Sequence, residues 1–261
     1  GLTMYYYIYD TFLNERKYDR VLAAIETRLT DLGISGKIGR LTPFTNARGL
    51  IRDEEKRGVK TIVVVGNDET VAKVVDGLGD SKVTLGIIPV GVPAAIAVSL
   101  GIPEGEEACD VLSKRITQKI DLGRINGHFF ISSVHIPKGR LLIEGEGRYR
   151  ISTLVEQCEV IVSNLMGGGV VLDERAGACA GDPKDGFLDT VITPRCGNFR
   201  GFFRSKLAAA SSVIPLRKVN ITSDEPISVV TDGRAVMSDK LFIEIVPDRL
   251  RVITGKERAF V

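Results

Sequence analysis

The chain has 261 residues, of which 44% are hydrophobic, and a formal net charge of +2. This length fits two domains of ordinary size, each with a sizeable core. The nearly neutral charge and the lack of a recognised binding motif argue against a nucleic-acid partner. The sequence shows no signal-peptide pattern and no apolar run near the roughly 20 residues of a membrane span, so we expect a cytoplasmic protein.

Residues 59–102 organise the first part of the chain. A β-branched run over residues 62–65 stops at Gly66 and is typical of a strand buried on both faces. A helix follows, for which Asp68 is the expected N-cap. A second buried strand over residues 85–88 leads into a turn and a short helix. Ligands of such parallel sheets bind at the carboxyl ends of the strands, which here carry the sequences GNDET and PVGVP.

The segments on either side predict the rest of the fold. Hydrophobic spacing predicts strands at residues 5–9 and 37–41, and helices at residues 17–32, 46–57 and 105–119. After residue 119, short alternating segments between Gly, Pro and Asn turns predict an antiparallel sandwich. We therefore expect a doubly wound α/β domain over residues 1–119, followed by an antiparallel β-sandwich domain over residues 120–261. The last residues are candidates for a return to the first domain.

The order of these motifs resembles the catalytic domain of the diacylglycerol kinase family, within the superfamily of lipid kinases and NAD kinase-like proteins. That family's first motif is G-G-D-G-T and its second is P-x-G-T-G-N-D-x-A. The matched positions are Gly66, Asp68 and Thr70 in the first motif and Pro89, Gly91 and Ala97 in the second. Later family motifs, D-L-G-x-x-N-G-x-x-F, D-G-x-L-D and the start of D-G-E, are matched at residues 121–130, 185–189 and 232–233.

The resemblance implies a lipid kinase fold with ATP and Mg²⁺ as cofactors. The residues that it assigns to nucleotide binding are Gly66, Asn67, Asp68, Thr70 and Gly91. It assigns a structural magnesium to Asp185 and Asp189, for which a turn closing a β-hairpin is the alternative explanation.

The sequence departs from the family at positions of the two nucleotide motifs and at the position of the family's proposed base. Asn67 and Glu69 stand where the family has glycines, and V-P-A-A replaces T-G-N-D at residues 92–95. A carboxylate about 4 Å from a phosphate oxygen would cost on the order of 4 kcal/mol, unless Glu69 points away or a metal intervenes. Arg234 replaces the glutamate proposed as the family's base, and arginine cannot be deprotonated at working pH. The catalytic candidates are Asp68, Glu69 and Arg234, although the first two are equally explained as helix-capping acids.

A basic segment over residues 195–218 contains six basic residues and no acidic one. Interleaved phenylalanines would give a helix here a basic flank and an aromatic face. This pattern favours peripheral binding to an anionic lipid surface at the inner membrane face, and a core-facing helix with solvated charges is the alternative. The residues assigned to this surface are Arg195, Arg200, Arg204 and Lys206.

Three functions remain open on the sequence. The first is a degenerate, non-catalytic relative of the lipid kinases, a pseudokinase that binds a ligand or partner at the interdomain cleft, where Arg234 supplies a positive charge. The second is an active ATP-dependent lipid kinase with a metal site rebuilt from Asp68 and Glu69. The third is a structural or regulatory interaction subunit. Edge strands of the second domain are candidates for pairing in a homodimer.

Overall fold

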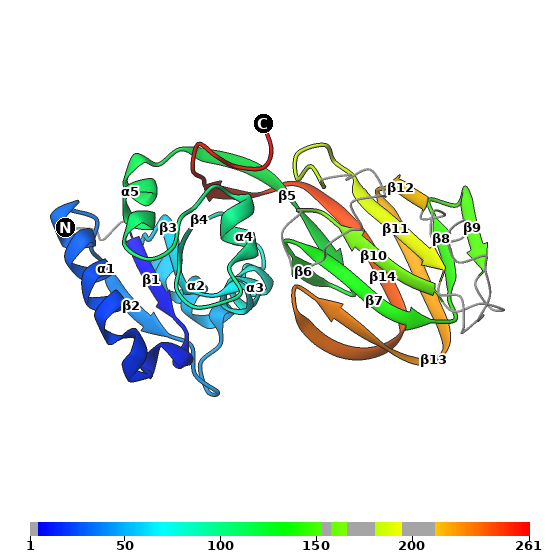
Figure 1. Cartoon of the computed structure of the whole chain (residues 1–261), viewed down its shortest axis with the longest axis horizontal. Helices are drawn as coiled ribbons and strands as arrows, with labels where there is room; N and C mark the ends of the chain where they lie inside the picture. Colours follow the sequence, from blue (N-terminus) through cyan, green and yellow to red (C-terminus); the bar gives the residue numbers. More distant parts are fainter. Residues whose placement is uncertain (1–4, 153–157, 166–180, 195–211) are drawn as a thin grey trace, which may run out of the picture. The chain divides into compact units, whose positions relative to one another are not determined.

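The computed structural model describes residues 5–152, 158–165, 181–194 and 212–261 (Figure 1). The chain divides into two compact units, residues 1–120 together with 248–261, and residues 121–247. The chain therefore leaves the first unit once and returns to it at its end. No helix in the described parts of the chain is long and apolar enough to cross a membrane.

The first unit alternates strands and helices, as its hydrophobic pattern predicts. Its elements are β1 (Tyr5–Tyr9), the 3-10 helices η1 (Thr11–Asn14) and η2 (Arg16–Tyr18), α1 (Asp19–Asp31), β2 (Lys37–Arg40), α2 (Ala47–Lys56), β3 (Thr61–Gly66), α3 (Asp68–Asp76), β4 (Thr84–Pro89), α4 (Ala95–Ser99) and α5 (Glu107–Lys114). Helix α5 ends earlier than predicted because Arg115 adopts a left-handed conformation with φ of 51°. The first helix starts later than predicted because residues 16–18 form a 3-10 turn of their own.

The strands of this unit form a parallel sheet in the order β4-β3-β1-β2. Strands β1 and β3 are neighbours, but β1 connects onward to β2 on one side and β3 connects to β4 on the other. Parallel crossovers are right-handed, so these opposite directions put helices on both faces of the sheet. In agreement, α1 packs against α5, and α2 packs against α3 (Figure 1). The predicted doubly wound layer is present.

The centre of this sheet is fully buried. Residues 62–65 of β3 have no exposed surface, and all five residues of β1 are buried. Such burial on both faces explains the uninterrupted β-branched run of the sequence. The central strands therefore hold the loops at their carboxyl ends in fixed positions.

The described residues of the second unit form strands and turns, as the turn-rich second half of the sequence predicts. Its elements are β5 (Thr117–Ile125), β6 (His128–Phe130), β7 (Ser133–Gly139), β8 (Leu142–Gly145), β9 (Tyr149–Ser152), β10 (Cys158–Ser163), β11 (Leu188–Pro194), β12 (Ser212–Leu216), β13 (Lys218–Thr231) and β14 (Arg234–Ile253). Strands β5 and β14 each cross between the two units.

The long strand β13 sets the topology of this unit. It pairs antiparallel with β14 along one side and shifts register between Thr222 and Ile227. On its other side, the first half pairs with β8, and the end pairs with β7, which continues through β10 and β11 to β12. A Cβ on Gly145 of β8 would meet the Leu216 side chain of β12, so the two branches face each other. Their buried side chains form a single hydrophobic core, as in a sandwich.

Candidate functional site

The candidate site lies at the carboxyl edge of the parallel sheet. Asp10 follows β1, Asn67 and Asp68 follow β3, and the turn over residues 90–94 follows β4. Because connections from β1 and β3 leave in opposite directions, this edge is a topological switch point, the usual position of ligand sites in such sheets. The fold brings together at this edge all the residues predicted to bind nucleotide: Gly66, Asn67, Asp68, Thr70 and Gly91.

Asn67, and not Asp68, is the N-cap of α3, which corrects the sequence prediction. Asn67 has an extended backbone, and its Oδ1 accepts a hydrogen bond from Thr70 N at 3.2 Å. In return, Thr70 Oγ1 accepts from Asn67 N at 3.3 Å. This reciprocal pair is a capping box. Asp68 is therefore the first residue inside the helix, and its side chain is available for another contact.

Asp68 caps the next helix, α4. Its buried carboxylate accepts Ala95 N on Oδ2 at 2.9 Å and Ile96 N on Oδ1 at 3.1 Å. The N-cap residue of α4 itself, Ala94, has no side-chain acceptor. Burial raises the pKa of Asp68, while the two backbone donors act in the opposite direction. Asp68 thus joins the start of α3 to the start of α4.

The backbone donors at the start of α3 are engaged within the chain. Asp68 N donates to Pro93 O at 2.8 Å, and the capping box uses the N–H groups of Asn67 and Thr70. The Asn67 side chain also donates to Val92 O at 3.3 Å. A helix N-terminus binds phosphate through N–H groups of this kind. In this chain, the turn after β4 and the helix's own side chains occupy the N–H groups of Asn67, Asp68 and Thr70.

A second buried carboxylate, Asp10, is missing from the site predicted from sequence. Its Oδ2 accepts from Thr70 Oγ1 at 2.9 Å and from Lys73 Nζ at 3.2 Å, and its Oδ1 accepts from Thr11 N at 2.8 Å. The signal that points to Asp10 is its position directly after a buried strand. No local spacing pairs it with Lys73, which is 63 residues away.

Glu69 lies beside Lys73 on the exposed side of α3. Its side chain is 59% exposed, and its Oε1 is 3.7 Å from Lys73 Nζ, one helical turn further on. Lys73 therefore contacts both Asp10 and Glu69. The Asp68 carboxylate has backbone partners on α4, so the two acids considered for a rebuilt metal site have separate partners here.

Gly91 lies at a position that admits no side chain. Its φ is +80°, and a Cβ would be 3.0 Å from Cε2 of Phe12. The rings of Phe12 and Tyr18 pack edge to face with centroids 5.4 Å apart. Packing alone explains the glycine, and its contact with a nucleotide stays a prediction.

Arg234 lies in the second unit, at the start of β14. Asp232 and Gly233 form the two-residue turn before it, with Thr231 opposite Arg234 and φ values of 46° and 82°. These angles are typical of a type I′ hairpin. The Asp232 carboxylate accepts the N–H groups of residues 131–133 at 2.8 to 3.1 Å. The matched D-G pair therefore builds a turn and its anchor, while a ligand role for Arg234 stays a prediction.

Asp185 lies in the turn before β11, and Asp189 is the second residue of that strand. Asp185 Oδ1 accepts from Phe187 N at 2.8 Å, and Asp121 Oδ2 accepts from Gly186 N at 2.9 Å. Burial raises the pKa of both Asp185 and Asp189, and neighbouring carboxylates add to the shift. A divalent cation would relieve this repulsion. Within the described ranges, however, no three His, Cys, Asp or Glu side chains are grouped to hold a metal. The visible geometry is the turn, and the magnesium site stays a prediction.

The predicted membrane-facing residues lie outside the described residues: Arg195, Arg200, Arg204 and Lys206. The end of the same basic segment is described. Arg217 N donates to Glu146 Oε1 at 2.6 Å, and the Arg217 guanidinium lies 5.0 Å from the centroid of the Phe187 ring.

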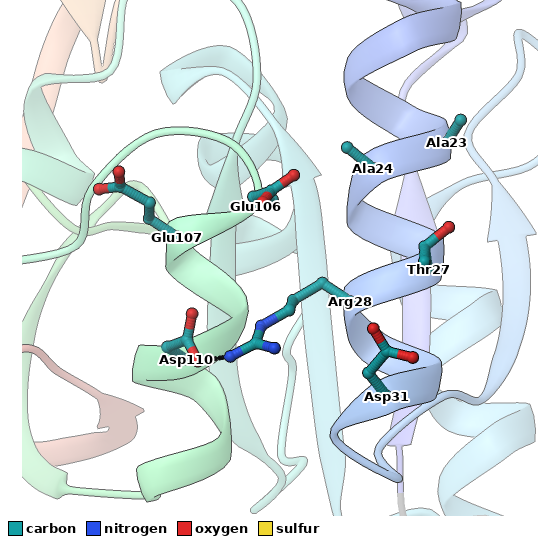
Figure 2. A pocket seen from close by; sticks show the side chains of 8 residues that line it. All are labelled: Ala23, Ala24, Thr27, Arg28, Asp31, Glu106, Glu107 and Asp110. Carbon is teal, nitrogen blue, oxygen red and sulfur yellow. Dashed lines mark hydrogen bonds and ion pairs between the residues drawn. The ribbon is translucent and has the colours of Figure 1, made fainter.

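A separate pocket of about 530 Å³ lies between α1 and α5. Figure 2 shows Arg28 reaching from α1 to Asp110 on α5, where Nη2 and Oδ1 are 2.5 Å apart. Other lining residues are small or acidic: Ala23, Ala24, Thr27, Asp31, Glu106 and Glu107. None of the residues predicted to bind nucleotide or metal lines this pocket.

Comparison with known sequences finds similarity to lipid kinases. Residues 5–125 match the model of the diacylglycerol kinase catalytic domain. The diacylglycerol kinase of Bacillus subtilis is 30% identical over 129 residues, which are 48% of this chain and 43% of that protein. A Pseudomonas aeruginosa protein named "Probable lipid kinase YegS-like" is 24% identical over 248 residues, 79% of this chain and 80% of that protein. The chain thus spans less than half the length of the Bacillus relative.

Solved structures share the fold over nearly the whole chain. A diacylglycerol kinase from Bacillus anthracis matches with a TM-score of 0.76 and 19% identity, covering 98% of each chain. An NAD kinase from Archaeoglobus fulgidus, solved with ATP, matches with a TM-score of 0.64 and 15% identity, covering 98% of this chain and 95% of that chain. Identities this low speak for the fold alone. The structural matches confirm the predicted combination of an α/β region with a sheet-rich C-terminal region.

Proposed function

We propose that the chain, whose residues 5–125 match the diacylglycerol kinase catalytic domain, is a non-catalytic member of that family whose role is binding rather than phosphoryl transfer. The observation that carries the proposal is the engagement of the Asp68 carboxylate by Ala95 N and Ile96 N. Each oxygen of this carboxylate already accepts one backbone N–H, so a metal bound there would compete with the cap of α4.

The requirements of the reaction support this proposal. Phosphoryl transfer needs donors around the phosphates, a metal held by carboxylates, and a group that orients or deprotonates the acceptor hydroxyl. Donors at the start of α3 already bond to Pro93 O and to the capping box. Residues 92–95 carry no side chain that donates to phosphate or ligates magnesium, and proline lacks even the backbone N–H. Arg234 cannot serve as a base.

The charges at this edge also oppose a nucleotide. Asp10, Asp68 and Glu69 bring three carboxylates, and Lys73 supplies one amine, which two of those carboxylates share. Two like charges about 4 Å apart repel by on the order of 4 kcal/mol at an effective dielectric near 20. A triphosphate would therefore meet the exposed Glu69 carboxylate where the family has a glycine, with the buried carboxylates of Asp10 and Asp68 behind it.

The alternative is an active lipid kinase that uses ATP and Mg²⁺. The names of the similar proteins favour it, because the Bacillus subtilis relative is called a diacylglycerol kinase. In this alternative, Asp68 would release the start of α4 and Glu69 would leave Lys73, so that both carboxylates face one metal. A regulatory subunit is the third reading, and a stable copurifying partner would favour it.

The deciding experiment measures phosphoryl transfer by the full chain. Labelled ATP is supplied with Mg²⁺ or Mn²⁺ and micelles of mixed lipid alcohols, with a catalytic relative assayed in parallel. Calorimetry follows ATP binding by the chain and by the variants Glu69→Gly and Glu69→Gln. We expect no labelled lipid above the reaction without protein, and no ATP binding at micromolar affinity by the unmodified chain.

Each outcome separates the readings. Labelled lipid whose formation is abolished by Asp68→Asn and by Glu69→Gln, but not by Lys114→Gln at the exposed last residue of α5, would establish the rebuilt metal site and overturn the proposal. Binding of ATP that appears only when the Glu69 carboxylate is removed would support the proposal. The edge would then be a nucleotide site from which the Glu69 charge repels the phosphates.

A further inference from the structure

The pocket of about 530 Å³ between α1 and α5, which we call the α1–α5 groove, is lined on one side by small residues (Figure 2). These are Ala23, Ala24 and Thr27 of α1. Larger side chains at the two alanines would fill the space between the helices, so their small size keeps the groove open. A second helix can therefore approach α1 closely at this point.

Carboxylates outnumber cations in the α1–α5 groove. Glu106 and Glu107 line it from the start of α5, Asp110 from the middle of α5, and Asp31 from the end of α1. Arg28 is the single cation among the lining residues, and its Nη2 lies 2.5 Å from Asp110 Oδ1. Among the residues that the structure describes, the other three carboxylates form no ion pair.

Helix stability explains part of this charge but not all of it. Acids at the start of a helix are stabilising, which accounts for the two glutamates of α5. Asp31 ends α1, where the helix dipole favours a cation instead. The hydrogen bond with Asp110 raises the pKa of Arg28, and the charge of Asp31 adds to the shift, so two carboxylates share one guanidinium. Lys114 acts on Asp110 as well, and the charge of Asp31 stays the least compensated.

Helix α2 carries the complementary charge. Arg52 and Lys56 lie one helical turn apart on its exposed side. Asp53 lies 3.8 Å from Arg52 and offsets part of this charge. The other acids of the helix are directed elsewhere, because Glu54 is buried and Glu55 Oε1 accepts a backbone hydrogen bond at 3.3 Å from the loop before β4. The exposed side of α2 is therefore basic on balance.

The shape of α2 also suits the groove. A Cβ at Gly49 would meet only Asn46 Oδ1 at 3.3 Å, so no other side chain covers the helix backbone there. Arg48 does not cover it, because its guanidinium lies against Gly79, where a Cβ would be 3.5 Å from Nη2. Helix α2 has ten residues and α5 has eight, which correspond to lengths of about 15 and about 12 Å. The two surfaces thus match in charge, in small residues and in length.

The sheet of the first unit lies between these two surfaces. Helices α1 and α5 pack together on one face, and α2 packs with α3 on the other, so α2 cannot enter the groove of its own chain. We propose that the chain associates head to tail, with α2 of one copy lying in the α1–α5 groove of the next. Arg52 and Lys56 then lie beside the unpaired carboxylates, and Gly49 faces the alanines of α1. The contact is heterologous, so each copy binds one neighbour on each face. It involves neither ATP nor the carboxyl edge of the sheet, and it stands or falls independently of the proposed function.

The first test is sedimentation velocity of the full chain over a range of concentrations, at low and at high salt. We expect the mean mass to rise beyond that of a dimer at low salt, and to rise less at high salt, because salt screens exposed charges. Arg52→Glu with Lys56→Glu should weaken the association by about tenfold or more, since like charges would then face each other. The matched control is Lys138→Glu with Arg140→Glu, at exposed residues of the second unit, and it should associate like the unmodified chain. Both double variants change the formal net charge from +2 to −2.

The second test mixes two variants that each keep one of the surfaces. Arg52→Glu with Lys56→Glu keeps the groove, and Asp31→Lys with Glu107→Lys keeps the basic side of α2. We expect each variant alone to stay monomeric, and the mixture to form a dimer that grows no further. Circular dichroism checks that both are folded. Asp31→Asn with Glu107→Gln, which removes the charges without reversing them, replaces the second variant if it does not fold.

Four outcomes would each overturn the proposal. They are a monomeric unmodified chain at low salt, association that both surface variants retain, equal loss of association in the control, and a mixture that stays monomeric. A dimer that forms only in the mixture would support the proposal, because two identical surfaces or an unrelated partner would not produce it.

Discussion

At the scale of single residues, two acids of the family motifs, Asp68 and Asp232, accept hydrogen bonds from the chain's own backbone. Asp68 accepts two N–H groups of α4, and Asp232 accepts those of residues 131–133. Hydrogen bonds to charged groups contribute about 1.5–3 kcal/mol each. Family resemblance connects both positions with chemistry, but in this fold each already has a full structural role. A metal bound to Asp68 would compete with the two N–H groups that its carboxylate accepts.

Asp189 is expected to give the chain a measurable pH dependence. Burial, followed by the charges of Asp185 and Asp182, raises its folded pKa above the ordinary value of 3.8. The folded chain therefore keeps this proton to a higher pH than the unfolded chain does. The stabilisation is complete below the unfolded pKa, and it is lost as the pH rises through the folded pKa. Asp189→Asn removes this loss, so its melting temperature relative to the unmodified chain should increase from about pH 4 to about pH 7.

The measurement is a set of calorimetric melts across that pH range. Asp239, an exposed acid of β14, provides the control Asp239→Asn, which removes a carboxylate from the surface. A constant difference between Asp189→Asn and the unmodified chain would show that the Asp189 carboxyl titrates alike in both states.

At the scale of elements, α3 and α4 depend on one another through their first turns. Helix α4 has only five residues, too few to be stable in isolation. Its first two N–H groups bond to the Asp68 carboxylate, and the turn before it bonds through Pro93 O to Asp68 N. The short helix is therefore held by tertiary contacts rather than by its own propensity.

Replacing Asp68 by alanine should weaken this connection. The N–H groups of Ala95 and Ile96 lose their acceptor, which is expected to cost about 2 kcal/mol in the free energy of unfolding. Glu69→Ala, at the next position of the same helix, removes an exposed carboxylate and should cost about 0.5 kcal/mol. Urea unfolding followed by circular dichroism measures both. Equal losses for the two variants would contradict the capping role of Asp68.

At the scale of the whole molecule, the chain end is tied back to the first unit. Strand β14 runs from the second unit into the first, where Arg251 and Val252 pair parallel with β4. Beyond it, Gly255 N donates to Leu100 O and Ala259 N donates to Ser99 O, both at 2.9 Å. Residues more than 150 positions apart along the printed sequence therefore share one core.

Gly255 should be sensitive to any side chain. A Cβ there would lie only 1.7 Å from Gly101 O, so Gly255→Ala must displace backbone. Overpacking of this kind typically costs about 1–3 kcal/mol, and we expect a lower melting temperature and faster hydrogen exchange in residues 98–102. The control is Gly49→Ala in α2, where a Cβ meets only Asn46 Oδ1 at 3.3 Å. A Gly255→Ala variant as stable as Gly49→Ala would show that the chain end is not packed as described.

The sequence by itself determined the order of strands and helices, the α/β and sheet-rich halves, and the family resemblance. Hydrophobic periodicity is local, and it records which face of each element is buried. Residues 62–65 illustrate this, because their β-branched run in the sequence corresponds to their complete burial in β3. The N-cap of α3 was misplaced by one residue, since Asn67 and Asp68 are both good capping residues.

Only the tertiary structure decided which partners the charged side chains have. Asp68 bonds to Ala95 N 27 residues away, and Asp10 contacts Lys73 63 residues away. No local pattern records such pairs, because the order and register of the strands bring them together. The acids of the motif were visible in the sequence, but their engagement within the fold depends on chain segments that meet only when the sheet has formed.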